Sequence, residues 1–262
     1  EKSRVVWSEI ELVNAHAELH HPAVRAALKY LEIERGVEIH HFADLPSRTG
    51  LGSSSAFTVG LLAALRELLG ESPGAADLAF QAIHVEQQLL KETVGVQDQI
   101  QTAHGGLNLV RIAQDGSYTL RPIVMPAART HAFQAHLLLY YTGISRHASK
   151  IAGSQVIAIR AGERDEELRL LADMAARGAA VLESGNLAEL GLMLHQAWII
   201  KRGLSPLVSS PEFDALYAAA QEAGATGGPA VGVGVDVLRR PGDPVRRRRA
   251  PPGHPDRLPH RP

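Results

Sequence analysis

Pro46-Ser47-Arg48-Thr49-Gly50-Leu51-Gly52-Ser53-Ser54-Ser55-Ala56 is a loop of small residues between a predicted strand and a predicted helix. The strand covers Val37 to Ala43, and the helix is an apolar run from Ala56 to Leu69. Glycines let the backbone approach a ligand closely and adopt positive φ angles. The first N–H groups of a helix lack internal partners, and the helix dipole favours negative charge there. The loop therefore predicts a binding site for phosphate.

Two common phosphate-binding motifs do not fit this loop. The Walker loop requires Gly-Lys-Ser/Thr, and no lysine occurs between Lys29 and Lys91. The dinucleotide fingerprint requires three glycines at GxGxxG spacing, whereas Ser55 stands at the third position. An ordinary strand–loop–helix corner, in which the serines only cap the helix, is the alternative to phosphate binding.

The composition is that of a soluble globular protein. The chain has 262 residues, enough for one large or two modest domains, and its formal net charge is -1. This charge gives no argument for a nucleic-acid or membrane partner. The absence of cysteine excludes disulfides and thiolate metal sites. No apolar run reaches the roughly 18–20 residues needed to span a bilayer, and no signal peptide is visible, so we expect a cytoplasmic protein.

Both ends of the sequence are unusual. The chain begins at Glu1 and enters a strand-like segment, Arg4 to Val13, at once, which indicates a missing N-terminal piece. Residues 229–262 contain 8 of the 15 prolines and 8 arginines, and the composition changes abruptly at Gly228. Such a segment is predicted to be a disordered tail. We favour a solvated tail or an altered reading frame over a basic arm for nucleic acid.

The remaining pattern mixes helices with hairpins and so favours an α+β fold over a regular parallel sheet. A hairpin is predicted at 107–112 and 117–124 around Asp115-Gly116, and a buried strand at 136–142. Helices are predicted at 22–35, 75–92, 148–160, 163–182, 186–200 and 210–223, with a further helical stretch that follows residues 96–99 and ends at residue 103.

Glu86 and Asp98 form the second set of residues that can carry chemistry. Glu86 lies in a predicted helix, and Asp98 stands between Gln97 and Gln99 in a short loop that begins at Gly95. One carboxylate could hold a divalent cation such as Mg²⁺, which prefers oxygen ligands, while the other orients a hydroxyl. Phosphoryl transfer needs little more than such positioning. The alternative is that both are solvated surface acids.

Taken in order, these motifs resemble the GHMP kinase superfamily, whose members phosphorylate small metabolites including sugars and mevalonate. The central motif of that superfamily, Pro-x-x-x-Gly-Leu-Gly-Ser-Ser-Ala, is similar to Pro46 to Ala56. Within the superfamily, residues 1 to 228 are most similar to the D-glycero-D-manno-heptose 7-phosphate kinase branch. The supporting motifs are His21-Pro22-Ala23-Val24-Arg25, Phe57-Thr58-Val59-Gly60-Leu61-Leu62, Gly95-Val96-Gln97-Asp98-Gln99, Gly105-Gly106-Leu107-Asn108 and Tyr141-Thr142-Gly143-Ile144-Ser145-Arg146.

The resemblance implies a two-lobed α+β fold. Residues 1–130 would form an ATP-binding lobe with a βαβ unit like that of ribosomal protein S5 domain 2, truncated at its start. Residues 131–228 would form an incomplete, ferredoxin-like second lobe, followed by the Arg/Pro-rich tail, 229–262.

The resemblance also implies roles for individual residues. Asp98 would be the catalytic residue that orients or deprotonates the acceptor hydroxyl. Ser54 and Glu86 would hold Mg²⁺, and Arg146 would meet the phosphate of the substrate. The ATP phosphates would be bound by the backbone around Gly50, Leu51, Gly52, Ser53, Ser54 and Ser55.

The sequence departs from the superfamily in two places. The opening motif Pro-x-Arg-Ile-Ser-Phe-x-Gly-Gly-Gly-Thr-Asp, which helps to form the sugar site, is absent. The closing motif Gly-Ala-Gly-Gly-Gly-Gly-Phe is replaced after Gly228, as a change of reading frame would do.

The predicted function is phosphorylation of a heptose 7-phosphate at its anomeric hydroxyl, with ATP and Mg²⁺. The alternatives are another sugar kinase of the fucose or galactose type, and a catalytically inactive remnant that binds nucleotide. The predicted partners are therefore nucleotide and sugar phosphate, and the sequence leaves the oligomeric state open.

Overall fold

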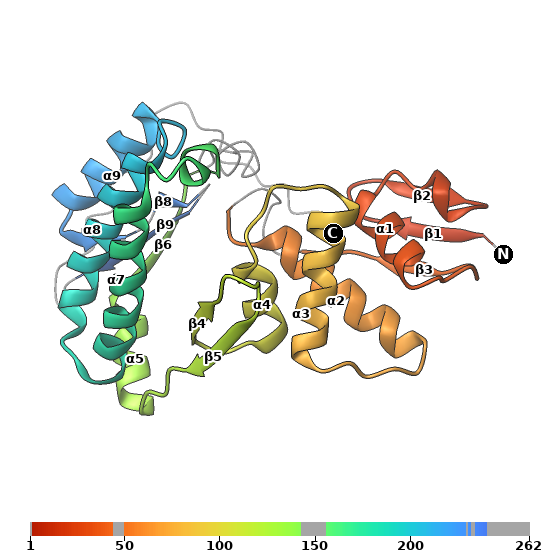
Figure 1. Ribbon diagram of the computed structural model, residues 1–262, viewed down its shortest axis with the longest axis horizontal. Helices are drawn as coiled ribbons and strands as arrows, with labels where there is room; N and C mark the ends of the chain where they lie inside the picture. The colour runs from red at the N-terminus through yellow and green to blue at the C-terminus, as the bar shows by residue number, and fades with distance from the viewer. Residues whose placement is uncertain (1, 44–49, 143–155, 229, 232–233, 240–262) are drawn as a thin grey trace, which may run out of the picture.

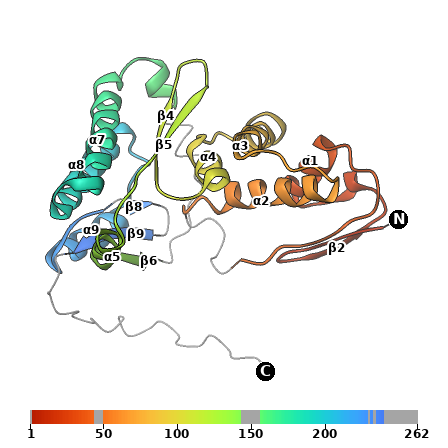
Figure 2. The same cartoon turned by 90° about the horizontal axis from the view of Figure 1, so that it is seen from below.

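The computed structural model describes residues 2–43, 50–142, 156–228, 230–231 and 234–239. Its elements form two groups, with the β4–β5 hairpin between them (Figures 1 and 2). Residues 46–49 of the predicted phosphate loop, Arg146 and the chain after residue 239 lie outside the described residues. The predicted α+β class is confirmed, because both groups combine helices with a small sheet and most strand pairs are antiparallel.

The first sheet contains β1 (Ser3–Val6), β2 (Ile10–Val13) and β3 (Glu38–His40), in the order β2-β1-β3. β1 pairs antiparallel with β2 and parallel with β3. The strand-like segment from Arg4 to Val13 therefore contains two strands, because the chain reverses between residues 6 and 10. The parallel pairing of β1 and β3 requires a crossover, which α1 (Pro22–Tyr30) supplies.

Helix α1 is shorter than predicted at its C-terminal end. It begins at Pro22, a residue well suited to the first turn, and the ring of His21 accepts a hydrogen bond from the N–H of Val24. The backbone of Glu32 has a φ angle of 53°, which no longer continues a right-handed helix. The prediction of a helix up to Arg35 is therefore corrected to an end at Tyr30.

The helices of the first group bury one apolar core. They are α2 (Ser53–Leu68), α3 (Ala75–Ile83), the π-helical turn η2 (His84–Leu89) and α4 (Gln97–His104). Val5, Val24, Leu28 and Leu62 are fully buried in one cluster contributed by β1, α1 and α2. This core holds α2 against the sheet and so positions the N-terminus of α2.

The hairpin joins the first group to the second. It consists of β4 (Asn108–Ile112) and β5 (Tyr118–Pro122), which pair antiparallel as predicted. The carboxylate of Asp115 accepts hydrogen bonds from the N–H and hydroxyl of Ser117, and Gly116 has a φ angle of 84°. Aspartate and glycine are well suited to such a turn.

The second group packs helices on one antiparallel sheet. The sheet contains β6 (Leu137–Tyr141), β9 (Gly234–Arg239) and β7 (Ala225–Gly227) in that order, and β8 (Ala230–Val231) pairs with β9. Its helices are α5 (Ala127–His136), α7 (Asp165–Ser184), α8 (Leu187–Leu204) and α9 (Pro211–Glu222), and residues 156–160 are also helical. Within the described ranges, no helix is long and apolar enough to cross a membrane.

Two features of this group correct the sequence predictions. Strand β9 lies inside the segment predicted to be a disordered tail, and it pairs with β6 from Leu137 to Tyr141. This pairing provides main-chain partners for a stretch rich in β-branched valine, which favours strands. Helix α5 was not predicted, and it contributes no buried residue, so the sequence carries no apolar pattern for it.

We predict that Leu62→Ala in α2 lowers the free energy of unfolding by about 2–5 kcal/mol, because it leaves a cavity in the core. Leu62 is 0% exposed, whereas Leu68 on the same helix is 49% exposed. Leu68→Ala is therefore the matched control, with an expected change within about 0.5 kcal/mol. Urea unfolding followed by the fluorescence of Trp7, which packs against the same core, measures both variants. Equal losses in the two variants would contradict the assigned core.

Candidate functional site

The start of α2 presents unused backbone donors. Gly50 and Gly52 have φ angles of 76° and 70°, and Gly52 is the residue that precedes the first helical position. The N–H of Ala56 donates to the carbonyl of Gly52 at 2.9 Å. The N–H groups of Ser53, Ser54 and Ser55 therefore precede the first donor of the helix ladder, at the positive end of its dipole. The predicted helix start at Ala56 is corrected to Ser53.

Asp98 lies directly against this helix start. It occupies the first turn of α4, and a Cβ atom placed on Gly52 would lie 3.1 Å from its Cγ and Oδ2 atoms. Such a distance is too short for ordinary side-chain packing, so glycine at position 52 allows the carboxyl group to approach the backbone. The carboxyl is half-buried, and this burial raises the pKa of Asp98 above its usual value.

Glu86 lies deeper, in the π-helical turn η2, and is 1% exposed. The hydroxyl of Ser55 donates to its Oε2 atom at 2.9 Å, and the hydroxyl of Thr58 donates to Oε1 at 3.0 Å. The side-chain amide of Gln99 also donates to Oε2. The carboxyl group of Glu86 is therefore surrounded by three donors from α2 and α4. Single π-helical turns are rare and occur often at functional sites.

Ser54 and Glu86, the predicted magnesium ligands, differ in their exposure to solvent. The side chain of Ser54 is exposed, and the serine that bonds to Glu86 is the next one, Ser55. In the part of the chain that is described, no group of three or more His, Asp or Glu side chains could hold a metal ion. Mg²⁺ bound with nucleotide commonly uses only one or two protein ligands together with phosphate oxygens and water. The oxygen of Ser54 fits such an ion, whereas the enclosed carboxyl of Glu86 does not.

A cavity of about 540 Å³ opens on the other side of Asp98. Its polar wall comes from the start of α4 and β4 and contains Gln97, Asp98, Gln101 and Asn108. The amide of Asn108 donates to the carbonyl of Gly105 at 2.7 Å and to Oε1 of Gln101 at 3.3 Å, which fixes this wall. Side chains of α7 and α8, including Leu171, Met174, Leu190 and Met193, provide the apolar wall. Asp98 therefore lies between the start of α2 and a cavity bounded by both groups of elements.

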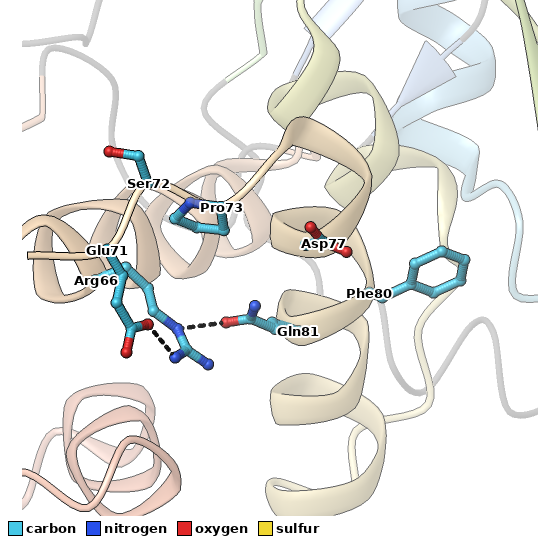
Figure 3. A pocket seen from close by; sticks show the side chains of 7 residues that line it. All are labelled: Arg66, Glu71, Ser72, Pro73, Asp77, Phe80 and Gln81. Atoms are coloured by element: carbon cyan, nitrogen blue, oxygen red, sulfur yellow. Dashed lines mark hydrogen bonds and ion pairs between the residues drawn. The ribbon is translucent and has the colours of Figure 1, made fainter.

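A second hollow, of about 440 Å³, lies beside the far end of α2 (Figure 3). Arg66 lines it, but its Nε donates to Gln81 at 3.0 Å and its Nη1 pairs with Glu71 at 2.5 Å. Because these contacts engage the guanidinium, we do not assign a phosphate site to this hollow. The helix start and Asp98 remain the candidate site.

The sequence singled out the central residues of this site but missed their contacts. Gly52 and Asp98 lie against each other, and the structure describes Gly50, Leu51, Ser53, Ser54 and Ser55 around the same helix start, while their roles stay predictions. The contacts of Ser55, Thr58 and Gln99 with Glu86 were not predicted, nor was the place of Gln101 in the cavity wall. The motif Gly105-Gly106-Leu107-Asn108 was the available signal for that wall. The role of Arg146 stays a prediction.

Comparison with known proteins identifies the first part of the chain. Residues 18–106 match the family model for the GHMP kinases N terminal domain. The chain is 27% identical over 196 residues to the D-glycero-alpha-D-manno-heptose 7-phosphate kinase of Campylobacter jejuni, covering 75% of this chain and 58% of the relative. It is 26% identical over 205 residues to the L-fucokinase/L-fucose-1-P guanylyltransferase of Bacteroides fragilis, covering 73% of this chain and 21% of the relative. The chain thus spans less than two thirds of these relatives.

Solved structures support the fold. A D-glycero-D-manno-heptose 1-phosphate kinase from Bacteroides thetaiotaomicron matches with a TM-score of 0.72 and 19% identity, covering 92% of this chain and 73% of that chain. The Lactococcus lactis galactokinase, solved with galactose, matches with a TM-score of 0.66 and 15% identity, covering 91% of this chain and 74% of that chain. At these identities the likeness concerns the fold, and it confirms the fold that the motifs predicted.

We predict that Asp98→Asn stabilises the protein near neutral pH, where the ionised Asp98 carboxyl is held in a half-buried place. Burial raises the pKa of Asp98, so the stability from its protonated form is fully present below the usual aspartate pKa of about 3.9. That stability is lost as pH rises through the pKa in the folded protein. The gain of the variant should therefore shrink as pH falls towards 4. Urea unfolding at a series of pH values measures it.

Asp115→Asn is the control with the opposite sign. Hydrogen bonds from Ser117 lower the pKa of Asp115, so its carboxylate stabilises the fold above the usual pKa. This variant should lose stability near neutral pH and lose less in acid. If Asp98→Asn follows the same direction as Asp115→Asn, the assigned environment of Asp98 is wrong.

Proposed function

We propose that this chain binds ATP and transfers its γ-phosphate to a sugar phosphate, because residues 18–106 match the family model for the GHMP kinases N terminal domain. The proposed acceptor is D-glycero-D-manno-heptose 7-phosphate, at its anomeric hydroxyl. The similarity to the Campylobacter jejuni heptose 7-phosphate kinase supports this acceptor class. The observation that carries the proposal is the position of Asp98, which contacts the start of α2 on one side and lines a cavity on the other.

The start of α2 is the proposed place of the ATP phosphates. The N–H groups of Ser53, Ser54 and Ser55 lie in the first turn of α2, at the positive end of the helix dipole, where phosphate oxygens are favoured. The positive φ angles of Gly50 and Gly52 keep side chains away from this end and let the phosphates approach the backbone. These residues need no positively charged side chain in order to bind an anion.

The acceptor is proposed to enter from the cavity side. Its hydroxyl would lie against Asp98, whose carboxylate takes the proton as the oxygen attacks the γ-phosphorus. The new oxygen–phosphorus bond forms as the bond to the β-phosphate oxygen breaks, and ADP leaves. A raised pKa suits this role, because a base works best when its pKa approaches the working pH. The side-chain amide of Gln97 and the Oδ1 atom of Asn108 would meet the other sugar hydroxyls, while the Nδ2 atom of Asn108 and the amide of Gln101 fix the wall.

Magnesium is proposed to accompany the nucleotide. The exposed hydroxyl of Ser54 would hold the ion together with phosphate oxygens and water, and the ion would neutralise charge on the phosphates. Arg146, outside the described residues, is retained as the proposed contact for the phosphate of the sugar.

A second acceptor class, fucose or galactose, follows from the similarity to the fucokinase of Bacteroides fragilis. A nucleotide-binding chain without turnover is the remaining alternative. Assays with heptose 7-phosphate, fucose and galactose, each coupled to ADP release, distinguish these functions. Turnover with fucose or galactose alone would replace the heptose proposal. ATP binding without turnover on any of the three would favour the inactive chain.

We predict that Asp98→Asn lowers kcat by about 10²–10⁴-fold, the usual contribution of a general base, while ATP binding is retained. The reason is that asparagine keeps the shape of the side chain but cannot accept the proton. Coupled assays give kcat, and calorimetry gives the affinity for ATP. The surface variant Asp115→Asn is the control and should keep the kcat of the unchanged chain. An Asp98→Asn variant with unchanged kcat would contradict the role of Asp98.

A further inference from the structure

We propose that Glu86 acts as a positioning residue that ties the start of α2 to the start of α4, rather than as a ligand of the metal ion. Its carboxyl group accepts hydrogen bonds from both helices. The expected effect of Glu86 on nucleotide binding rests on the proposed function of the same site. Its effect on the stability of the fold does not, because the three hydrogen bonds join protein groups only.

The donors on Glu86 come from the two elements that form the site. Ser55 and Thr58 belong to the first turns of α2, which carry the proposed phosphate-binding N–H groups. Gln99 follows Asp98 directly in α4. A single carboxyl group therefore sets the spacing between the phosphate end of α2 and the proposed base.

The surroundings of Glu86 leave little room for a metal ion. The residue is 1% exposed, and its two oxygens accept three hydrogen bonds from protein groups. A nucleotide-bound Mg²⁺ keeps several waters and phosphate oxygens, so its protein ligands must face solvent and nucleotide. The π-helical turn η2 aims the side chain of Glu86 inward, towards α2 and α4.

Gln99 depends on Glu86 for its orientation. It is 0% exposed, its Nε2 atom donates to Glu86, and its Oε1 atom has no hydrogen-bond partner among the described residues. Turning the amide over would place Oε1 against the oxygen of Glu86, so the contact with Glu86 selects one orientation. Because Gln99 is buried next to Asp98, loss of this contact disturbs the first turn of α4.

Removing the acceptor is costly at such a place. Glu86→Gln keeps one acceptor oxygen and replaces the other with an NH₂ group, so either Thr58 or the pair of Ser55 and Gln99 faces a donor in place of an acceptor. The double variant Glu86→Gln with Gln99→Glu exchanges donor and acceptor and restores the pair with reversed direction. A positioning role survives this exchange, whereas a metal ligand at position 86 does not return.

The experiment compares four variants of the whole chain with the unchanged chain: Glu86→Gln, the exchanged pair, Ser55→Ala and Ser54→Ala. Thermal unfolding gives the stability, and calorimetry gives ADP affinity with Mg²⁺ and with EDTA. We expect Glu86→Gln and Ser55→Ala to lower the unfolding temperature. We also expect them to weaken ADP binding about equally in both conditions, by about tenfold for Glu86→Gln. The exchanged pair should recover most of both losses.

Ser54→Ala is the matched control, one residue from Ser55. It should keep the unfolding temperature and Mg²⁺-free affinity but lose affinity gained from Mg²⁺. A Glu86→Gln variant that behaves in this way instead would overturn the proposal. If Glu86→Gln fails to fold, Ser55→Ala decides the question. A Ser55→Ala variant with unchanged stability and unchanged ADP affinity would then overturn the positioning role of Glu86. An unchanged chain that binds no ADP contradicts the proposed function and leaves the unfolding temperatures to decide the role of Glu86.

Discussion

The contact between the backbone of Gly52 and the carboxyl of Asp98 determines where the site can lie. A Cβ atom at position 52 would stand 3.1 Å from that carboxyl, and the φ angle of 70° also disfavours any other residue. The contact brings the positive end of α2 and an acidic side chain together, and no described residue forms an ion pair with Asp98. Burial then raises the pKa of Asp98, which a salt bridge in the same place would lower. The close approach of Asp98 to the start of α2 thus depends on glycine at position 52.

The sequence predicts this part of the molecule well because local rules govern it. Glycines at positions 50 and 52 permit the positive φ angles, and the apolar spacing that follows requires a buried helix. The hairpin around Asp115-Gly116 follows from equally local turn chemistry. These elements need no knowledge of distant contacts, so the motif order sufficed to predict the superfamily and fold.

The sequence could not predict the features that depend on distant partners. Helix α5 contributes no buried residue, and so leaves no periodic pattern. Strand β9 is stabilised by pairing with β6, about one hundred residues earlier in the chain, and it lies within a segment, residues 229–262, whose overall composition is that of a tail. The same limit applies to the site: spacing alone could not tell whether Ser54 or Ser55 reaches Glu86, because adjacent helix positions point in different directions.

Glu86 and Asp98 are two carboxylic acids that differ in burial, and the roles proposed for them differ accordingly. Asp98 lines the cavity, and no hydrogen bond or ion pair of its carboxyl group is found among the described residues. Glu86 is enclosed and accepts three hydrogen bonds, which fix the side chains of Ser55, Thr58 and Gln99. A group cannot easily do both, since a carboxyl that is free to meet a substrate is also free to move. In the proposed reaction, the enclosed acid would hold the two helices in place while the more exposed acid meets the substrate.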